Sequence, residues 1–363
     1  MILLFLIFIF LVLRFTVTLF NFISNPKLPV SGRHYADLVS ILIPVRNEAH
    51  AILHLLESIQ LQDYVNYEVL VLDDSSTDST FPVVEEFCRT RDKFSVVRSA
   101  PLPEGWVGKN FACHQLARAA HGQYLLFLDA GSVIRHGLIN NAVHRMKYGR
   151  LSLLSLLPNQ EMKTFGERLV VPLMHYLLLN LLPLRLVRLS GSSSFAAASG
   201  QFMLFESAGY RDHEWHSVVR SKAPEDVEIM RLVKGVGFHG ETLLANGFIL
   251  CRSYAGYREA VHGFSRNILA GFGNNVAALL LYLFLVIIGP LSVAFYLGLE
   301  LLLFGIGLIV LTRIMISLAA GQNPWINLLL HPLQMFSLLI VAVIAIRKRF
   351  LRTMTWKGRK MTI

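Results

Sequence analysis

The most constraining feature of this chain is an apolar segment at residues 2–23, which is almost entirely Leu, Ile, Phe and Val. About 20 apolar residues are enough for a helix to cross the hydrocarbon core of a bilayer. A secretory signal peptide would show a basic n-region and a small-residue cleavage site, and neither is present. We therefore expect residues 1–24 to be an uncleaved membrane anchor, in which Arg14 is costly unless it reaches the interface or pairs with another group.

Apolar residues also dominate the C-terminal part, at residues 276–346. Gly289-Pro290 and Gly298–Glu300 divide its first stretch into two candidate spans, and Asn323-Pro324 separates a third at 326–346. Only 16% of the chain is charged, against about 25% in ordinary soluble domains. We therefore expect transmembrane segments at this end too, although the number of spans stays open.

The tail at residues 347–363 is basic and contains no acidic residue. Its seven cations contribute much of the net charge of +10 and are Arg347, Lys348, Arg349, Arg352, Lys357, Arg359 and Lys360. Basic charge beside apolar spans favours contact with anionic lipid head groups. No module that binds nucleic acid is visible, so we expect a membrane partner and no nucleic acid. The positive-inside rule places the tail in the cytoplasm, but three C-terminal spans would separate it from a cytoplasmic catalytic domain.

Between the apolar ends, short apolar runs alternate with helical patterns. The runs at 39–45, 67–74, 93–99 and 123–131 predict strands, and the segments at 51–60, 80–91 and 111–122 predict helices, the last closed by Gly122 as its C-cap. Strands that are apolar throughout predict a mostly parallel sheet covered on both faces. Such sheets bind ligands beyond the carboxyl ends of their strands.

Residues 168–189 are apolar but interrupted by charged and polar residues and by Pro172 and Pro183. A spanning helix here would put Asp226 and Asp73 on opposite sides of the membrane. We therefore expect a pair of helices that lie in the membrane interface.

Polar residues cluster where three of the predicted strands end, at Arg46 to Glu48, at Asp73 and Asp74, and at Asp129. Adjacent aspartates there can accept hydrogen bonds from a base or a ribose, and Asp129 can hold a divalent cation through oxygen ligands. Asp78 lies in the same acidic segment as Asp73, but an N-terminal capping role explains it better.

Two further motifs contain candidate residues. In GWVGKN the glycines let the backbone approach a ligand, and Lys109 is a point charge suited to a diphosphate, although an exposed loop lysine is the alternative. Glu225-Asp226 precedes an amphipathic run, where acids favour a helix start. One such carboxylate also suffices as a general base for an acceptor hydroxyl. The three cysteines show no metal-ligand spacing, so we expect free thiols.

In this order, the motifs resemble the family 2 glycosyltransferases with the GT-A fold, a Rossmann-like α/β fold. The similarity is greatest to the branch that contains carotenoid (diaponeurosporenoate) and hopanoid-associated glycosyltransferases. The residues that carry the resemblance are Pro44, Asn47, Glu48, Asp73, Asp74, Lys109, Asp129, Glu225 and Asp226, with the segments ASGQFMLF (198–205) and CRSY to FSRN (251–267).

The resemblance implies roles for most of these residues. Pro44, Glu48, Asp73, Asp74, Lys109 and Asp129 would bind the nucleotide sugar, with Lys109 at the diphosphate and Asp129 at a Mg²⁺ or Mn²⁺ ion. Asp226 would be the catalytic base. The acceptor side would be formed by Gly200, Gln201, Glu225 and Arg266.

Two departures from the family pattern matter. The family's metal motif is Asp-X-Asp, but the second position here is Gly131, which weakens the metal site. Processive synthases carry Gln-X-X-Arg-Trp, whereas residues 261–267 read VHGFSRN, which argues against a polymerising enzyme.

The sequence thus predicts an inverting enzyme that transfers a sugar from a nucleotide-diphosphate donor, expected to be a UDP-sugar, to a lipid-like acceptor such as a carotenoid, an isoprenoid or a glycolipid. Its GT-A domain would span residues 36–270, include the interfacial helices 168–189, and face the cytoplasm from a multi-pass anchor in the cell (inner or plasma) membrane. The alternatives are a polysaccharide synthase and a catalytically inactive binding protein.

Overall fold

The computed structural model describes residues 2–290, 296, 298–351, 355–356 and 359–360. The chain divides into two compact units. The helical unit comprises residues 1–25, 160–183 and 252–354, and the sheet unit comprises residues 26–159, 184–251 and 355–363. Residues 160–183 and 252–270, which the sequence assigns to the catalytic domain, thus group with the terminal helices.

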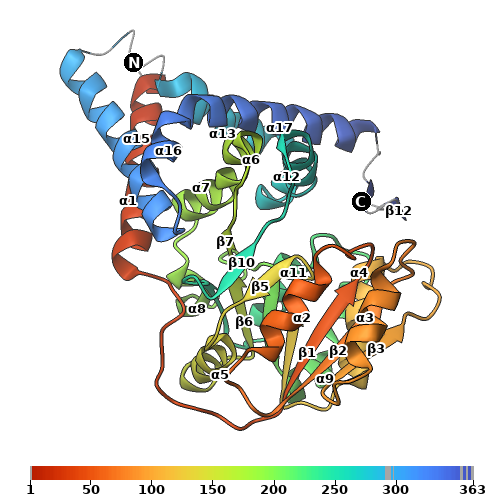
Figure 1. Cartoon of the computed structure of the whole chain (residues 1–363). Helices are drawn as coiled ribbons and strands as arrows, with labels where there is room; N and C mark the ends of the chain where they lie inside the picture. Colours follow the sequence, from red (N-terminus) through yellow and green to blue (C-terminus); the bar gives the residue numbers. More distant parts are fainter. Residues whose placement is uncertain (1, 291–295, 297, 352–354, 357–358, 361–363) are drawn as a thin grey trace. The chain divides into compact units, whose positions relative to one another are not determined.

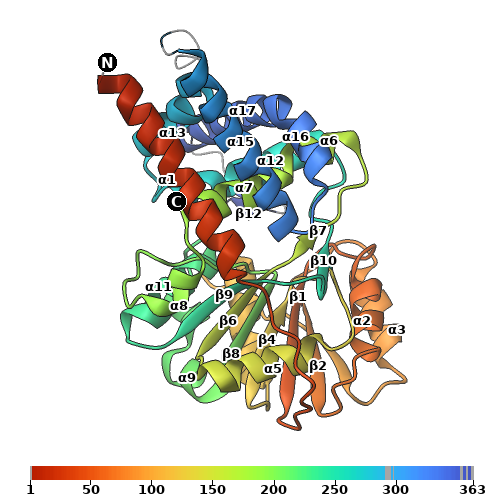
Figure 2. The ribbon, with the colours of Figure 1, turned by 90° about the vertical axis from the view of Figure 1, so that its left-hand side faces the viewer.

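The sheet unit is built on a seven-stranded sheet with the order β3-β2-β1-β4-β8-β6-β9 (Figures 1 and 2). Its strands are β1 (Val39–Val45), β2 (Tyr67–Asp73), β3 (Phe94–Arg98), β4 (Tyr124–Leu128), β6 (Leu153–Leu157), β8 (Phe202–Glu206) and β9 (Gly240–Leu244). β8 runs antiparallel to β4 and β6, and the other neighbours are parallel. The predicted α/β fold with a mostly parallel sheet is confirmed.

Helices cover this sheet and bury its inner strands, whereas three of the five residues of the edge strand β3 are exposed. All five residues of β4 and of β6 are buried. Helix α4 packs against β1 and β2, and α5 against β6. The helices of the sheet unit are α2 (Ile52–Gln60), α3 (Thr80–Cys88), α4 (Gly108–Ala119), α5 (Leu138–Gly149), α8 (Arg185–Leu189), α9 (Ser207–His213), α10 (Trp215–Val218) and α11 (Glu225–Gly235). Short strands complete the described elements: β5 (Ser132–Ile134), β7 (Asn159–Gln160), β10 (Ile249–Cys251), β11 (Thr355–Trp356) and β12 (Arg359–Lys360).

One edge of the sheet gathers the segments that carry the predicted site. β1 lies between β2 and β4 and is parallel to both, so the carboxyl ends of these three strands meet at the same edge. The antiparallel strand β8 begins there, because Phe202 pairs with Leu128 at the end of β4. Residues 46–48, 73–74, 129 and 200–201 therefore flank one edge of the sheet.

Gly122 is not the C-cap that the sequence suggests. Helix α4 ends at Ala119, and its C-cap Ala120 is extended. Gly122 instead lies against β1, where its N–H donates to Ser40 Oγ at 2.7 Å. A Cβ atom at this position would lie 2.6 Å from the backbone nitrogen of Ser40. The close approach of two backbones, not a helix end, requires glycine here.

The helical unit contains the N-terminal helix and most of the C-terminal part. Its helices are α1 (Ile2–Ser24), α6 (Phe165–Val170), α7 (Pro172–Leu181), α12 (Tyr257–Gly271), α13 (Val276–Leu283), the π-helical turn η1 (Phe284–Ile288), α15 (Leu299–Ala319), α16 (Pro324–Leu329) and α17 (His331–Leu351). Arg14 of α1 is buried and donates to Tyr176 Oη at 2.6 Å and to Asn180 Oδ1 at 3.4 Å. The cost of Arg14 is thus offset by polar partners on α7.

The apolar helices only partly follow the expected segments. Among the described residues, Leu4–Ser24 and Leu299–Ala319 are long and apolar enough to cross a membrane, and the bent pair Tyr257–Gly271 with Val276–Ile288 would be a third if it is one span. The expected span at 326–346 is divided between α16 and α17, and neither is a candidate span. Residues 168–189 form parts of three helices, and not the expected pair, because Pro172 begins α7 and Pro183 lies between α7 and α8.

The basic tail is only partly described. Arg347, Lys348 and Arg349 belong to the last turns of α17. Arg352 and Lys357 lie outside the described residues, and Arg359 and Lys360 are described only as the backbone of β12.

Gly122→Ala tests the contact between the backbones of residues 122 and 40. The added Cβ atom must push β1 or the segment before β4, and overpacking of this kind costs about 1–3 kcal/mol. We expect a lower thermal midpoint in detergent. Gly235→Ala is the matched control, because a Cβ there meets nothing within 4 Å. Equal midpoints for Gly122→Ala and wild type would contradict this account of Gly122.

Candidate active site

The first part of the candidate site is the loop after β1. Pro44 lies in β1 and pairs in register with Leu72. Asn47 has a φ of +52°, and its side-chain oxygen accepts the N–H of Thr77 at 2.8 Å. The N–H of Glu48 donates to Thr80 Oγ1 at 2.9 Å. These bonds attach the loop after β1 to the loop after β2, so Glu48 lies close to the acidic segment.

Asp73 and Asp74 end β2 and are both only 4% exposed. Asp73 Oδ2 accepts the N–H of Ser76 at 3.1 Å, but its buried Oδ1 has no hydrogen-bond partner among the described residues. Arg46 lies beside Asp74, with its Nη1 atom 2.6 Å from the backbone oxygen of Asp74. A buried carboxylate oxygen without a donor is costly, so a ligand hydroxyl or N–H would stabilise Asp73.

Asp78 is not the N-cap of α3 that the sequence predicts, because the N-cap is Ser79, but its side chain still contacts the first turn of this helix. Its Oδ1 accepts the N–H of Thr80, the first residue of α3, at 3.0 Å. Asp78 therefore stabilises the start of this helix.

The second part of the site brings together the first turns of two helices. Lys109 lies in the first turn of α4, and Glu225 and Asp226 lie in the first turn of α11. Lys109 Nζ is 2.7 Å from Glu225 Oε1 and 3.5 Å from the backbone oxygen of Gly200. The N–H of Gly200 donates to Asp226 Oδ2 at 2.7 Å, and the N–H of Val227 donates to Asp226 Oδ1 at 2.8 Å. Asp226 is therefore held in one orientation by two backbone donors.

The charges of this cluster influence one another. Burial and the neighbouring charge of Glu225 raise the pKa of Asp226 to about 6, against the opposing effect of Lys109 and the two N–H donors. Burial alone would lower the pKa of Lys109, but the carboxylates of Glu225 and Asp129 raise it above its usual value. Burial alone would raise the pKa of Glu225, but the charge of Lys109 outweighs this effect, so the pKa of Glu225 is lowered. Near neutral pH, Lys109 and Glu225 are charged and Asp226 is a carboxylate that still accepts a proton readily.

Asp129 follows β4 and is half-buried. Ala130 and Gly131 offer no side-chain oxygen, and among the described residues no three His, Cys, Asp or Glu side chains form a metal-binding group. Mg²⁺ can be held by one or two carboxylates together with substrate phosphates. The residues therefore fit a cation that arrives with a diphosphate and uses Asp129 as its protein ligand.

The predicted acceptor residues are divided between the two units, with Gly200, Gln201 and Glu225 in the sheet unit and Arg266 in the helical unit. Gly200 and Gln201 precede β8 at the carboxyl edge, and Gln201 Nε2 lies 2.8 Å from Cys251 Sγ. Arg266 lies on α12 of the helical unit, next to Ser265, whose hydroxyl accepts from Lys348 at 2.9 Å. The cysteines are free thiols, as expected, with Cys113 and Cys251 buried and Cys88 half-buried.

Two buried residues near Lys109 and Glu225, Tyr210 and His216, were not predicted from the sequence. His216 of α10 is 1% exposed, and its Nδ1 atom is 2.6 Å from Tyr210 Oη. Burial lowers the pKa of His216 to about 3, so the ring is neutral. The charge of Glu225 acts in the opposite direction, which shows that Glu225 is close enough to influence His216. An isolated histidine in a short helix carries no sequence signal that would have identified it.

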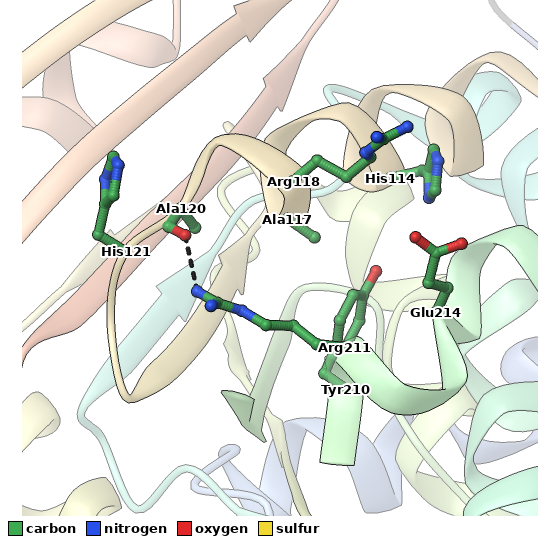
Figure 3. Close-up of a pocket in the computed structure, with 8 residues that line it drawn as sticks. All are labelled: His114, Ala117, Arg118, Ala120, His121, Tyr210, Arg211 and Glu214. Carbon is green, nitrogen blue, oxygen red and sulfur yellow. Dashed lines mark hydrogen bonds between the residues drawn. The ribbon is translucent and has the colours of Figure 1, made fainter. Parts of the chain in front are cut away.

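Figure 3 shows a cavity of about 420 Å³ in the sheet unit. It is lined by His114, Ala117, Arg118, Ala120, His121, Tyr210, Arg211 and Glu214. Arg211 donates to the backbone oxygen of Ala120 at 2.9 Å. None of the predicted site residues lines this cavity, and the convergence of Lys109, Glu225 and Asp226 is the stronger indication of chemistry.

Comparison with known proteins agrees with the motifs. Residues 40–206 match the model of the family described as "Glycosyl transferase family 2". The 4,4'-diaponeurosporenoate glycosyltransferase of Staphylococcus aureus (strain USA300) is 34% identical over 132 residues, which are 36% of this chain and 34% of the relative. The chain thus spans about a third of the length of the curated relatives it matches.

Among solved structures, a mannosyltransferase from Pyrobaculum calidifontis in complex with GDP-Man and Mn²⁺ is similar with a TM-score of 0.57 and 17% sequence identity. The match covers 97% of this chain and 100% of that one. This likeness concerns the fold alone, and it agrees with the predicted GT-A fold of the α/β part of the chain.

Proposed function

We propose that this chain, whose residues 40–206 match the model of glycosyl transferase family 2, transfers a sugar from a nucleotide-diphosphate donor to a lipid-like acceptor with inversion at the anomeric carbon. The observation that carries the proposal is the position of Asp226. It is a carboxylate with a raised pKa, held by the N–H of Gly200 beside a lysine at the carboxyl edge of the sheet. A base of this kind, near a cation suited to phosphate, is what direct displacement requires.

The reaction then proceeds in one displacement. Asp226 accepts the proton of the acceptor hydroxyl while the hydroxyl oxygen forms a bond to the anomeric carbon. The bond from that carbon to the diphosphate oxygen breaks, and the nucleoside diphosphate leaves with the electron pair. Lys109 stabilises the charge on this leaving group. Asp73, Asp74 and Glu48 bind the nucleoside part.

A divalent cation, held by Asp129, would neutralise diphosphate charge when bound. The Mn²⁺ in the mannosyltransferase structure supports such a cation in this fold. Because Asp129 has no second carboxylate beside it, the donor's own phosphates would supply the other ligands.

The helical unit supports a lipid-like acceptor. Two of its helices are apolar and long enough to cross a membrane. The similar S. aureus protein is named for a diaponeurosporenoate acceptor. A UDP-sugar is our proposed donor. Gly200, Gln201 and Arg266 are the residues that we propose for contact with the acceptor. A polysaccharide synthase would instead produce a ladder of product lengths, and an inactive binding protein would release no nucleoside diphosphate from any donor.

Asp226→Asn tests the base. The amide keeps the shape of the side chain but cannot accept the proton, so we expect turnover to fall by at least about 10²-fold. Donor binding should stay within a few-fold. Turnover is measured as release of nucleoside diphosphate in the presence of acceptor lipid. Near-normal turnover in this variant would exclude Asp226 as the base.

The pH dependence of kcat/KM tests the same residue independently. Asp226 acts as a base only when it is ionised, and its pKa is about 6. We therefore expect kcat/KM to be level above this pH and to fall about tenfold per pH unit below it. A profile with no acid limb between pH 5 and 7 would contradict the assignment.

Gly131→Asp tests the metal site. A Cβ at this position meets nothing within 4 Å, so the larger side chain has room. If position 131 faces the cation, the second carboxylate should lower the Mg²⁺ or Mn²⁺ concentration needed for half-maximal activity. Gly131→Ala, which adds no oxygen, is the control. An unchanged metal requirement in a folded Gly131→Asp protein would place the cation elsewhere.

Labelling of single cysteines in intact cells tests our proposal that the sheet unit and the basic tail both face the cytoplasm. The positive-inside rule motivates it. A cysteine at the exposed position Ser221 and one after Ile363, in a background without the native cysteines, should react only after the membrane is permeabilised. Reaction of the tail cysteine from outside would contradict the proposed orientation of the tail.

A further inference from the structure

Lys109, the proposed partner of the donor diphosphate, already has a counter-ion. Its ammonium is 2.7 Å from Glu225 Oε1, and the Glu225 side chain is only 10% exposed. The Lys109 side chain is itself 22% exposed. A buried carboxylate at this distance holds the lysine in one orientation, and removing its partner leaves an uncompensated charge. A diphosphate that binds Lys109 must therefore compete with Glu225.

Gly200 makes this arrangement possible. A Cβ atom on residue 200 would lie 2.8 Å from Lys109 Nζ, 3.1 Å from Glu225 Oε1 and 3.5 Å from Asp226 Oδ2. The backbone of Gly200 thus lies against all three charged groups. Its carbonyl oxygen accepts from Lys109 Nζ, and its N–H donates to Asp226 Oδ2. Without a side chain, residue 200 leaves Lys109 and Glu225 in direct contact.

We infer that Glu225 is a positioning residue, which holds Lys109 at the diphosphate site while no donor is bound and releases it to the donor's diphosphate. This inference rests on the proposed function, and it moves Glu225 from the acceptor side, where the family resemblance places it, to the donor side. The ion pair with Lys109 is the reason for the change.

Release of Lys109 has a consequence for Asp226. Among the described residues, the titratable side chains whose charges act on Lys109, Glu225 or Asp226, besides these three themselves, are Cys113 of α4, Asp129 after β4 and His216 of α10. Lys109 favours the ionised form of Asp226, and Glu225 disfavours it. When Lys109 turns to the diphosphate, Glu225 stays beside Asp226 without its cation. Asp226 then holds a proton more tightly, so donor binding strengthens the base.

The binding of UDP and GDP to the full-length protein, measured by calorimetry, tests the inference. Glu225→Gln keeps the shape of the side chain and removes its charge, so Lys109 no longer has to be withdrawn from a carboxylate. We expect binding of whichever diphosphate the wild type recognises to tighten by about three- to tenfold, the usual range for coupled neighbours. Glu228→Gln on the same helix, where Glu228 pairs with Arg231, is the matched control and should leave binding unchanged.

A double-mutant cycle separates release of Lys109 from simple repulsion. If Glu225 only repels the diphosphate, Glu225→Gln will tighten binding equally in a Lys109→Met background. We expect the effect to disappear in that background, and to be absent for UMP and GMP, which lack the second phosphate. Equal tightening with and without Lys109, or weaker binding in Glu225→Gln, overturns the inference. If the wild type binds neither diphosphate, the proposed function fails together with the inferred role of Glu225.

Two further readouts do not depend on binding strength. In a structure of the wild-type protein with UDP or GDP, Lys109 Nζ should contact phosphate and lie more than 4 Å from Glu225. In Glu225→Gln, the acid limb of the kcat/KM profile should move to lower pH, because the charge that raises the pKa of Asp226 is gone. An intact Lys109–Glu225 pair beside a bound diphosphate, or an unmoved acid limb, would contradict the role of Glu225.

Discussion

The ion pair between Lys109 and Glu225 is the interaction on which the candidate site depends. It joins the first turn of α4 to the first turn of α11, and Gly200, in the segment before β8, lies against it. The antiparallel direction of β8 makes this meeting possible, because it brings the start of β8 to the end of β4 at the carboxyl edge of the sheet. The Asp226 carboxylate, the Lys109 ammonium and two backbone donors are thereby held together, which is the arrangement that our proposed mechanism requires.

The strands near this edge were predictable because their sequence pattern is strong. β1, β2 and β4 are apolar runs followed by polar loop residues, and the structure places them within the expected ranges. β6, β8 and β9 were not predicted, because short apolar runs such as LLSLL do not distinguish a strand from a buried helix. The reversed direction of β8 also leaves no trace in the sequence, since pairing partners lie far apart along the chain.

The sequence indicates candidate site residues, which stay predictions, but it does not indicate their contacts. Asp73, Lys109 and Asp226 were identified from motifs and from the family resemblance. The pairing of Lys109 with Glu225 joins segments that only the folded sheet brings together, so the sequence could not show it. The partners of Arg14 were hidden in the same way. The expectation that Arg14 needs a polar partner follows from the cost of charge in an apolar helix, but only the fold identifies Tyr176 and Asn180.

The central claim is that Asp226 activates a lipid hydroxyl for transfer of a single sugar. Mass spectrometry of lipids from cells that express the wild-type chain, Asp226→Asn or neither tests it most directly. The account predicts a lipid that carries one additional sugar residue in cells with the wild-type chain and its absence in the other two. Identical lipid profiles in all three, or a ladder of products with many sugars, would contradict it.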